Sequence, residues 1–144
     1  MVIRLKFLPI VLLLFLGVLG CNNVKPGDLT GTWVMTEASR QVLPSELQKA
    51  AATIILDANG TFVASEMPGL FYVPSRRAAQ LERGRGVWKL VSREGKQQVQ
   101  IDFQEIRGWE DHLPYGTQLE VSRGSLFYFF GDADEGRRVA FERR

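Results

Sequence analysis

The chain has 144 residues, of which 45% are hydrophobic and 24% are charged, and this length fits a single domain. Arg4 and Lys6 lie in a segment that we expect to be removed, and without them the 18 basic side chains fall to the number of acidic ones, 16. A neutral mature chain excludes a strongly basic nucleic-acid surface. The single Cys excludes an intramolecular disulfide, and together with the single His it excludes a zinc site of the Cys/His type.

Residues 1–20 have the pattern of a secretory signal. Arg4 and Lys6 form a positively charged start, and the run from Phe7 to Gly20 is uncharged and 14 residues long. A membrane-spanning helix needs about 18 apolar residues or more, so this run is too short to span and matches the apolar part of a signal peptide. We therefore predict a signal helix, removed in the mature protein, over residues 1–20.

The run ends in Val18-Leu19-Gly20-Cys21, which resembles the lipobox of bacterial lipoproteins, with Leu19 where Ala or Ser is more usual. The resemblance implies that Cys21 carries a diacylglyceryl thioether and becomes an acylated (palmitate-type) N-terminus, which anchors the chain stably to a membrane. Asn22 follows instead of Asp, which points to the outer membrane in a Gram-negative organism and otherwise to the plasma-membrane surface. The alternative is a freely secreted protein with an incidental Cys.

Residues 21–29 are polar, with Pro26 and Gly27 among them, and they are interpreted as a lipidated tether. Residues 30–144 show no break in composition and no repeat, which predicts one domain. Alternation of apolar and polar residues dominates this part, as in the run through Val99, Ile101 and Phe103. Such alternation is typical of strands with one buried face. It predicts eight strands, at residues 31–36, 53–57, 61–66, 86–92, 97–104, 117–122, 125–131 and 137–142.

Two loops are predicted to contain short helices. Residues 45–52 carry Leu47 and Ala50 at helical spacing, and Ser75 can cap a second helix that ends at Arg83, before Gly84. Short turns with Gly at residues 57–60, 93–96 and 123–124 join strands two to three, four to five and six to seven as hairpins.

Eight sequential antiparallel strands predict an all-β fold, an eight-stranded antiparallel up-and-down barrel without exposed edges. A two-sheet sandwich would produce the same alternation. In the barrel, the short turns and both termini fall at one end, here called the base, and the long loops fall at the other end, the mouth. We therefore expect the mouth to point away from the membrane that holds Cys21.

Gly31-Thr32-Trp33 opens the first predicted strand and is similar to the Gly-x-Trp signature of lipocalins. The resemblance implies that Trp33 packs across the closed base of a lipocalin-like barrel and that Arg143 or Arg144 lies over it. Cation–π stacking of that kind is worth about 0.5–2 kcal/mol, and Gly31 would admit the close approach. The helix that usually follows the last strand of a lipocalin is missing.

The predicted mouth loops carry large apolar and aromatic side chains and the single His. These candidate ligand- or partner-binding residues are Leu70, Phe71, Tyr72, Trp109, His112 and Tyr115. Large apolar side chains at loop tips are unusual unless they cap something. They either form a gate for a ligand or a partner, or fold inward as a lid that completes the core.

Catalytic and metal-binding patterns are weak in this sequence. The carboxylates of Glu105, Glu110 and Asp111 near His112 have no fixed geometry in a loop, and residues 132–136 fit a turn better than a calcium loop. There is no nucleophile motif or phosphate loop. We expect no enzyme activity, no metal, no cofactor and no nucleic-acid partner.

The sequence thus predicts a monomeric, lipid-anchored protein of the cell envelope whose barrel binds a small apolar or amphipathic ligand at its mouth. The alternative is a structural or interaction protein with a filled barrel, which docks an envelope protein through its loops or through the strand at residues 125–130. That strand is aromatic on both faces, and the predicted inward side chains of Phe62, Trp88 and Phe103 are large, which favours a filled interior.

Overall fold

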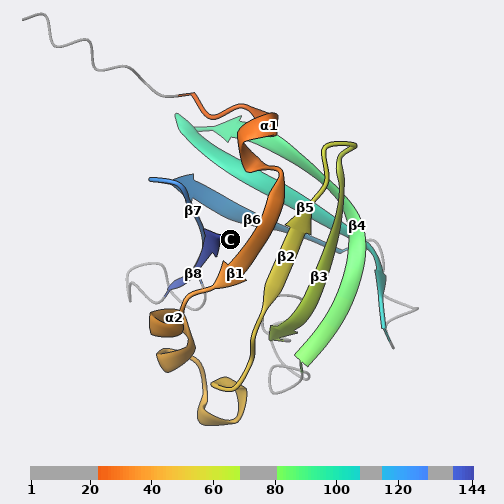
Figure 1. Cartoon of the computed structure of the whole chain (residues 1–144). Coiled ribbons are helices and arrows are strands. Elements are labelled where there is room, and N and C mark those ends of the chain that lie inside the picture. The colour runs from red at the N-terminus through yellow and green to blue at the C-terminus, as the bar shows by residue number, and fades with distance from the viewer. Residues whose placement is uncertain (1–22, 69–80, 108–114, 130–137) are drawn as a thin grey trace, which may run out of the picture.

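The computed structural model describes residues 23–68, 81–107, 115–129 and 138–144. Eight strands pair in sequence order, each antiparallel to the next, and the first pairs with the last, so the sheet closes on itself (Figure 1). The predicted all-β, eight-stranded up-and-down barrel is therefore confirmed, and the sandwich is excluded.

The strands lie close to their predicted positions, apart from an earlier start of the fourth. They are β1 (Gly31–Met35), β2 (Thr53–Leu56), β3 (Thr61–Pro68), β4 (Leu81–Arg93), β5 (Lys96–Ile106), β6 (Tyr115–Ser122), β7 (Ser125–Phe129) and β8 (Arg138–Arg143). The described helical segments are α1 (Pro26–Leu29), α2 (Glu37–Gln41) and the single 3-10 turn η1 (Ser45–Leu47).

The helix predicted at residues 45–52 is wrong in place and length. The α-helix of this connection is α2, which begins where the backbone N–H of Ser39 donates to the Thr36 hydroxyl, 3.2 Å away. Only one 3-10 turn forms at Ser45–Leu47, and the chain then leads into β2. Leu47 and Ala50 are buried, so their spacing reflects two separate contacts with the core and not one helix face.

The second predicted helix, at residues 75–83, is also wrong where it can be compared. Residues 75–80 lie outside the described part of the chain, but Leu81 and Glu82 already belong to β4, opposite Pro68 and Met67 of β3. Pairing with β3 satisfies the backbone groups that a helix would otherwise satisfy internally.

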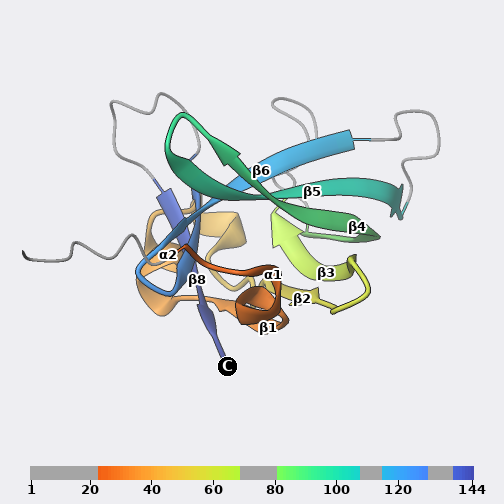
Figure 2. The ribbon, with the colours of Figure 1, turned by 90° about the horizontal axis from the view of Figure 1, so that it is seen from above.

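The long strands β4 and β5 curve over the core (Figure 2). Two irregularities bend this part of the sheet: a register shift beside Glu66, whose φ is 51°, and a second shift between Arg85 and Gly86. Bulges of this kind increase the local twist and bend of a strand. The bend brings the Phe103 ring so close to Gly84 that a Cβ there would lie 2.7 Å from it.

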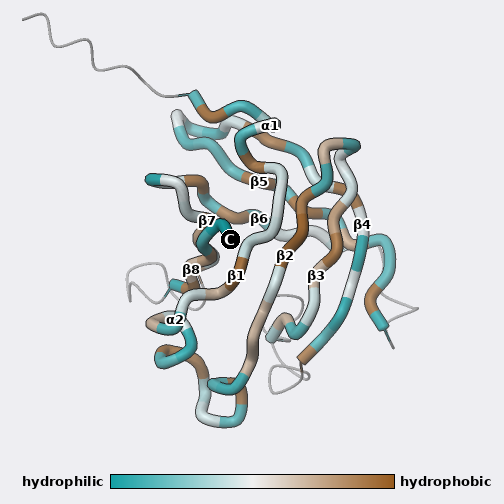
Figure 3. The backbone as a smooth tube through the Cα atoms, in the orientation of Figure 1, coloured by the Kyte–Doolittle hydropathy of each residue, from teal (hydrophilic) through white to brown (hydrophobic). Residues whose placement is uncertain are grey.

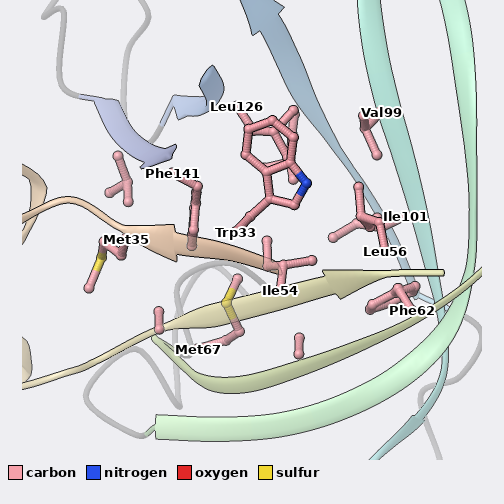
Figure 4. Close-up of a cluster of buried hydrophobic side chains, with 14 of the residues drawn as sticks. Trp33, Met35, Ile54, Leu56, Phe62, Met67, Val99, Ile101, Leu126 and Phe141 are labelled. Carbon is pink, nitrogen blue, oxygen red and sulfur yellow. The ribbon is translucent and has the colours of Figure 1, made fainter. Parts of the chain in front are cut away.

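Apolar side chains from all eight strands fill the barrel, and polar ones alternate with them along the chain (Figures 3 and 4). Phe62 and Phe103 meet edge to face, with ring centroids 4.9 Å apart. Ile54, Ala64 and Met67 have no surface that water can reach. A water-sized void against these side chains would expose them, so this part of the interior is packed solid.

The two ends of the barrel differ as predicted. The turns at 57–60, 93–96 and 123–124 lie at the base, where positive φ values at Gly60, Gly95 and Gly124 close them tightly. Figure 1 shows α1 at this end and α2 at the opposite end. The base therefore carries the short turns, and the mouth carries the connection from β1 to β2.

Candidate functional site

The base of the barrel is closed by residues that were interpreted as a free tether. Leu29 of α1 is buried, and Val24 packs against the core. The amide side chain of Gln97 on β5 binds the backbone of Val24 twice: its Nε2 donates to the carbonyl oxygen at 2.9 Å, and its Oε1 accepts from the N–H at 2.8 Å. Residues 24–29, here called the base segment, are thus part of the folded barrel.

Gly31, Trp33 and Arg143 meet around this base segment. The buried indole of Trp33 donates from Nε1 to the Leu29 carbonyl oxygen at 2.8 Å, and Arg143 lies directly opposite Trp33 in the β1–β8 pair. The guanidinium donates from Nη1 to the Asp28 carbonyl oxygen at 3.0 Å. It also lies 3.2 Å from where a Cβ on Gly31 would stand, at a φ of 128°.

Arg143 therefore binds the backbone of α1, and its contact with the base is a hydrogen bond. No stacking of this guanidinium on the Trp33 indole occurs within the described residues, in contrast to the expected cation–π pair. The cation–π contact that the structure does give lies on the outer face, where the Arg138 guanidinium carbon is 4.6 Å from the centre of the Phe127 ring.

Three hydroxyl-bearing side chains point into the barrel near the mouth: Tyr115 and Thr117 of β6, and Tyr128 of β7. We call them the mouth cluster. Each lies on the face of its strand that buries Leu119 or Leu126 further down, and each is only half-buried. The hydroxyls of Thr117 and Tyr128 form a hydrogen bond. Tyr115 stands opposite Phe103, so its ring continues the apolar wall of the core.

Burial raises the pKa of both phenols in the mouth cluster, because an apolar surrounding disfavours the charged phenolate. The pKa of Tyr128 is raised further by the neighbouring charge of Tyr115 on ionisation, and the hydrogen bond from Thr117 offsets part of that rise. Both side chains are therefore neutral hydrogen-bonding groups at physiological pH.

We predict that the mouth cluster makes the fold sensitive to alkali. A phenol whose pKa is raised in the folded chain keeps its proton where the unfolded chain, with a pKa of about 10, has lost it. Stability is then full below about pH 10 and falls as the pH rises through the folded pKa values. The substitution Tyr128→Phe should flatten this decline, as measured by melting temperature between neutral and alkaline pH. If melting temperature fell with pH at the same slope in the parent protein and in Tyr128→Phe, this result would contradict the burial of the Tyr128 phenol.

A buried carboxylate, Glu82, also faces the interior near the mouth. It lies on the inner face of β4, opposite Met67, and is 7% exposed. Sequence reasoning missed it because residues 75–83 were interpreted as a helix, where Glu82 would lie on a solvated face. Exposed and buried residues alternate from Leu81 to Trp88, but Leu81 is exposed and Glu82 buried, so no apolar alternation in the sequence marks this part of the strand.

Part of the mouth is sealed by the connection between β1 and β2. Leu43 and Leu47 from this connection are buried in the core. The Ser39 hydroxyl ties α2 to the barrel by accepting a hydrogen bond from the backbone N–H of Ala140 at 2.7 Å. The lid alternative concerned residues that lie mostly outside the described part of the chain, and the half-buried inward side chains of the described mouth lie on β6 and β7.

Some hollows are lined only by described residues, and these lie on the outer surface of the barrel. The one over β3, β4 and β5 has a volume of about 450 Å³ and is flanked by an ion pair, in which Arg85 Nε lies 2.7 Å from Glu105 Oε2. Beside it on β2, β3 and β4, Ile55, Val63 and Val87 are 39%, 39% and 37% exposed, which makes this an apolar patch of the described surface.

Tyr115 is the one predicted mouth residue that the structure places. Leu70, Phe71, Tyr72, Trp109 and His112 lie outside the described residues, as does Cys21. Within the described part, no three His, Cys, Asp or Glu side chains gather in a group that could hold a metal ion. The same part contains no helix of the length and apolarity that crossing a membrane requires.

Comparison with known proteins gives no relative: no family model, curated protein or solved structure matches this chain.

Proposed function

We propose that this chain is a lipid-anchored protein of the cell envelope whose barrel binds a small amphipathic ligand at its mouth. Lipidation at Cys21 is supported by the lipobox-like sequence, and Asn22 supports the outer membrane of a Gram-negative organism as its location. The ligand site that the geometry favours is the β6–β7 side of the mouth. The protein acts as a monomer and as a binder, not as an enzyme.

The mouth cluster is the observation that carries this proposal. Apart from Glu82, the described interior is otherwise packed with apolar side chains, whereas Tyr115, Thr117 and Tyr128 are half-buried and face inward. Their rings offer an apolar wall, and their hydroxyls offer hydrogen bonds at one end of it. Binding sites combine these two features, with a few polar groups that orient a largely apolar ligand.

The packing also limits the size of the ligand. Because Phe103, Ile54 and Met67 are fully buried, a ligand cannot enter the lower barrel without displacing the core. We therefore expect a short or single-ring amphiphile held beneath the mouth, and not a long acyl chain threaded through the barrel.

Native mass spectrometry tests this proposal on residues 23–144, which keep the base segment that closes the barrel. We expect a ligand from an envelope extract to remain bound, and the single-ring amphiphile 4-propylphenol to compete with it. Thr117→Val removes one hydroxyl of the mouth cluster and should weaken binding about fivefold, since a buried hydrogen bond is worth about 1 kcal/mol.

The matched control is Thr32→Val, which makes the same chemical change on the outer face of β1. Thr32 precedes the inward-facing Trp33, so its hydroxyl is remote from the mouth, and binding should be unchanged. If both variants bound the ligand with the affinity of the parent protein, the mouth cluster would not be the ligand site.

Docking of an envelope protein is a second candidate, favoured by the packed interior and by the exposed Ile55, Val63 and Val87. An exposed β-surface with branched apolar side chains is suited to contact another protein. Val63→Lys should abolish the interaction if this surface is the interface. Retention of a partner by this variant, at parental affinity, would exclude the surface.

A further inference from the structure

The docking of residues 24–29 leaves little free chain between the proposed anchor and the barrel. Val24 is held by Gln97, and only Asn22 and Asn23 separate it from Cys21. Three residue steps span at most about 11 Å even when fully extended. The lipidated residue would therefore stand within about 11 Å of the base.

The base segment is fixed at several points along its length. Gln97 holds its start with two hydrogen bonds, Arg143 binds the Asp28 carbonyl near its end, and Trp33 binds the carbonyl of Leu29. Leu29 itself is buried. Peeling the segment away would expose Leu29 and leave the buried indole N–H without its acceptor, so the short connection is the stable form.

We propose that the base of the barrel lies directly against the lipid headgroups, with the mouth facing away from the membrane; this rests on the proposed lipidation of Cys21. The contact surface is formed by α1 and the three base turns. At the exposed tips of this surface, a Cβ on Gly27, Gly95 or Gly124 would meet no atom within 4 Å, so nothing in the barrel itself covers them.

The short connection to Cys21 holds the base against the membrane, and electrostatic attraction to the lipids is not required. Lys96 Nζ lies 3.3 Å from Glu120 Oε2. The cations of the base, Lys25, Arg93, Lys96 and Arg123, are matched in number by the carboxylates of Asp28, Asp57, Glu94 and Glu120. With its cations offset in this way, the base has no strong preference for anionic lipids. Uncharged, zwitterionic headgroups are therefore sufficient partners.

Two matched labels test the orientation. Ala58 is exposed in a base turn, and Ala38 is exposed on α2 at the mouth end. The full chain carrying Ala58→Cys or Ala38→Cys is matured, labelled with a maleimide fluorophore and placed in phosphatidylcholine vesicles that contain a nitroxide-headgroup lipid. Because Cys21 is the only native Cys and its thioether does not react, each protein carries a single label.

We expect the Ala58→Cys label to be quenched several-fold more strongly than the Ala38→Cys label. Raising the salt until the Debye length is about 3 Å should leave this difference unchanged. A Gly/Ser spacer of about 20 residues between Asn23 and Val24, with a mean span of about 25 Å, should reduce it.

Two results would overturn the inference, and they are distinguishable. Intact-mass measurement reports lipidation directly, and a chain without acyl mass refutes the anchor and the orientation together. A lipidated chain whose two labels are quenched equally refutes only the orientation. Quenching that disappears in high salt would show that charge, and not the short tether, holds the base.

Discussion

Of the glycines that the structure describes, Gly86 is expected to disrupt the barrel most when it is replaced by alanine. A Cβ at this position would lie 2.0 Å from the carbonyl oxygen of Asp102 and 2.9 Å from the backbone nitrogen of Gln104. Both atoms belong to the backbone of β5, so no side chain can rotate away. Overpacking usually costs about 1–3 kcal/mol, and a backbone collision should cost at least the upper end of that range, about 3 kcal/mol.

Urea denaturation of the parent protein and of Gly86→Ala measures this difference in the free energy of unfolding. Gly27→Ala is the control. A Cβ on Gly27 meets nothing within 4 Å, and Gly27 lies in α1, so its replacement should change stability by less than about 1 kcal/mol. If Gly86→Ala lowered the free energy of unfolding as little as the control does, the pairing of Gly86 with Phe103 between β4 and β5 would be wrong.

Trp33→Ala is expected to have the second large effect, a loss of about 3–5 kcal/mol, as is usual when a buried Trp is truncated. The indole is buried and contributes both core packing and the hydrogen bond to the Leu29 carbonyl. Removing it leaves a cavity at the base and frees the last residue of α1. Equilibrium unfolding in urea gives the free energy directly.

Trp33→Phe separates the two contributions of the indole. It keeps most of the ring but leaves the Leu29 carbonyl without its donor, which should cost about 1–3 kcal/mol. Proteolysis at residues 24–29 should increase in this variant before the barrel itself unfolds. If residues 24–29 were equally resistant to proteolysis in the parent protein and in Trp33→Phe, the hydrogen bond would not hold α1.

The strands were predictable because each has one face in the core. The alternation around Val99, Ile101 and Phe103 appears in the structure as three buried side chains on β5, and Gly-containing turns marked the base. The short helix α2 was not predictable in this way. Its five residues, Glu37–Gln41, bury only Ser39, so no apolar period marks it, and a polar capping contact forms it instead.

The fourth strand shows why local signals can mislead. Gly84 was interpreted as the residue after a helix and Gly86 as the start of a strand, but both lie on the inner face of β4. There the Phe103 ring and the β5 backbone leave no room for a side chain. That requirement depends on a strand nearly 20 positions away, and sequence spacing alone does not contain it. Glu82 was misinterpreted for the same reason.

The candidate site was only partly predictable. Tyr115 was identified as an aromatic residue of a predicted mouth loop, although it is the first residue of β6. Thr117 and Tyr128 lie inside predicted strands and were not identified. The aromatic run of β7 was interpreted either as a strand covered on both faces within the fold or as an interface. Its faces are in fact divided, since Leu126 is buried and Tyr128 half-buried on the inner side, while Phe127 lies outside under Arg138. Gln97 carried no signal, because it stands in a polar stretch.

The paired hydrogen bonds between Gln97 and Val24 have a mechanical consequence. A pull on an anchor at Cys21 would reach the barrel first at this pair, ahead of any strand pairing. Yielding there and along α1 would release residues 24–29 and lengthen the connection by about 20 Å, while the closed ring of strands stayed intact. The base segment would thus take up tension and protect the barrel from being pulled open.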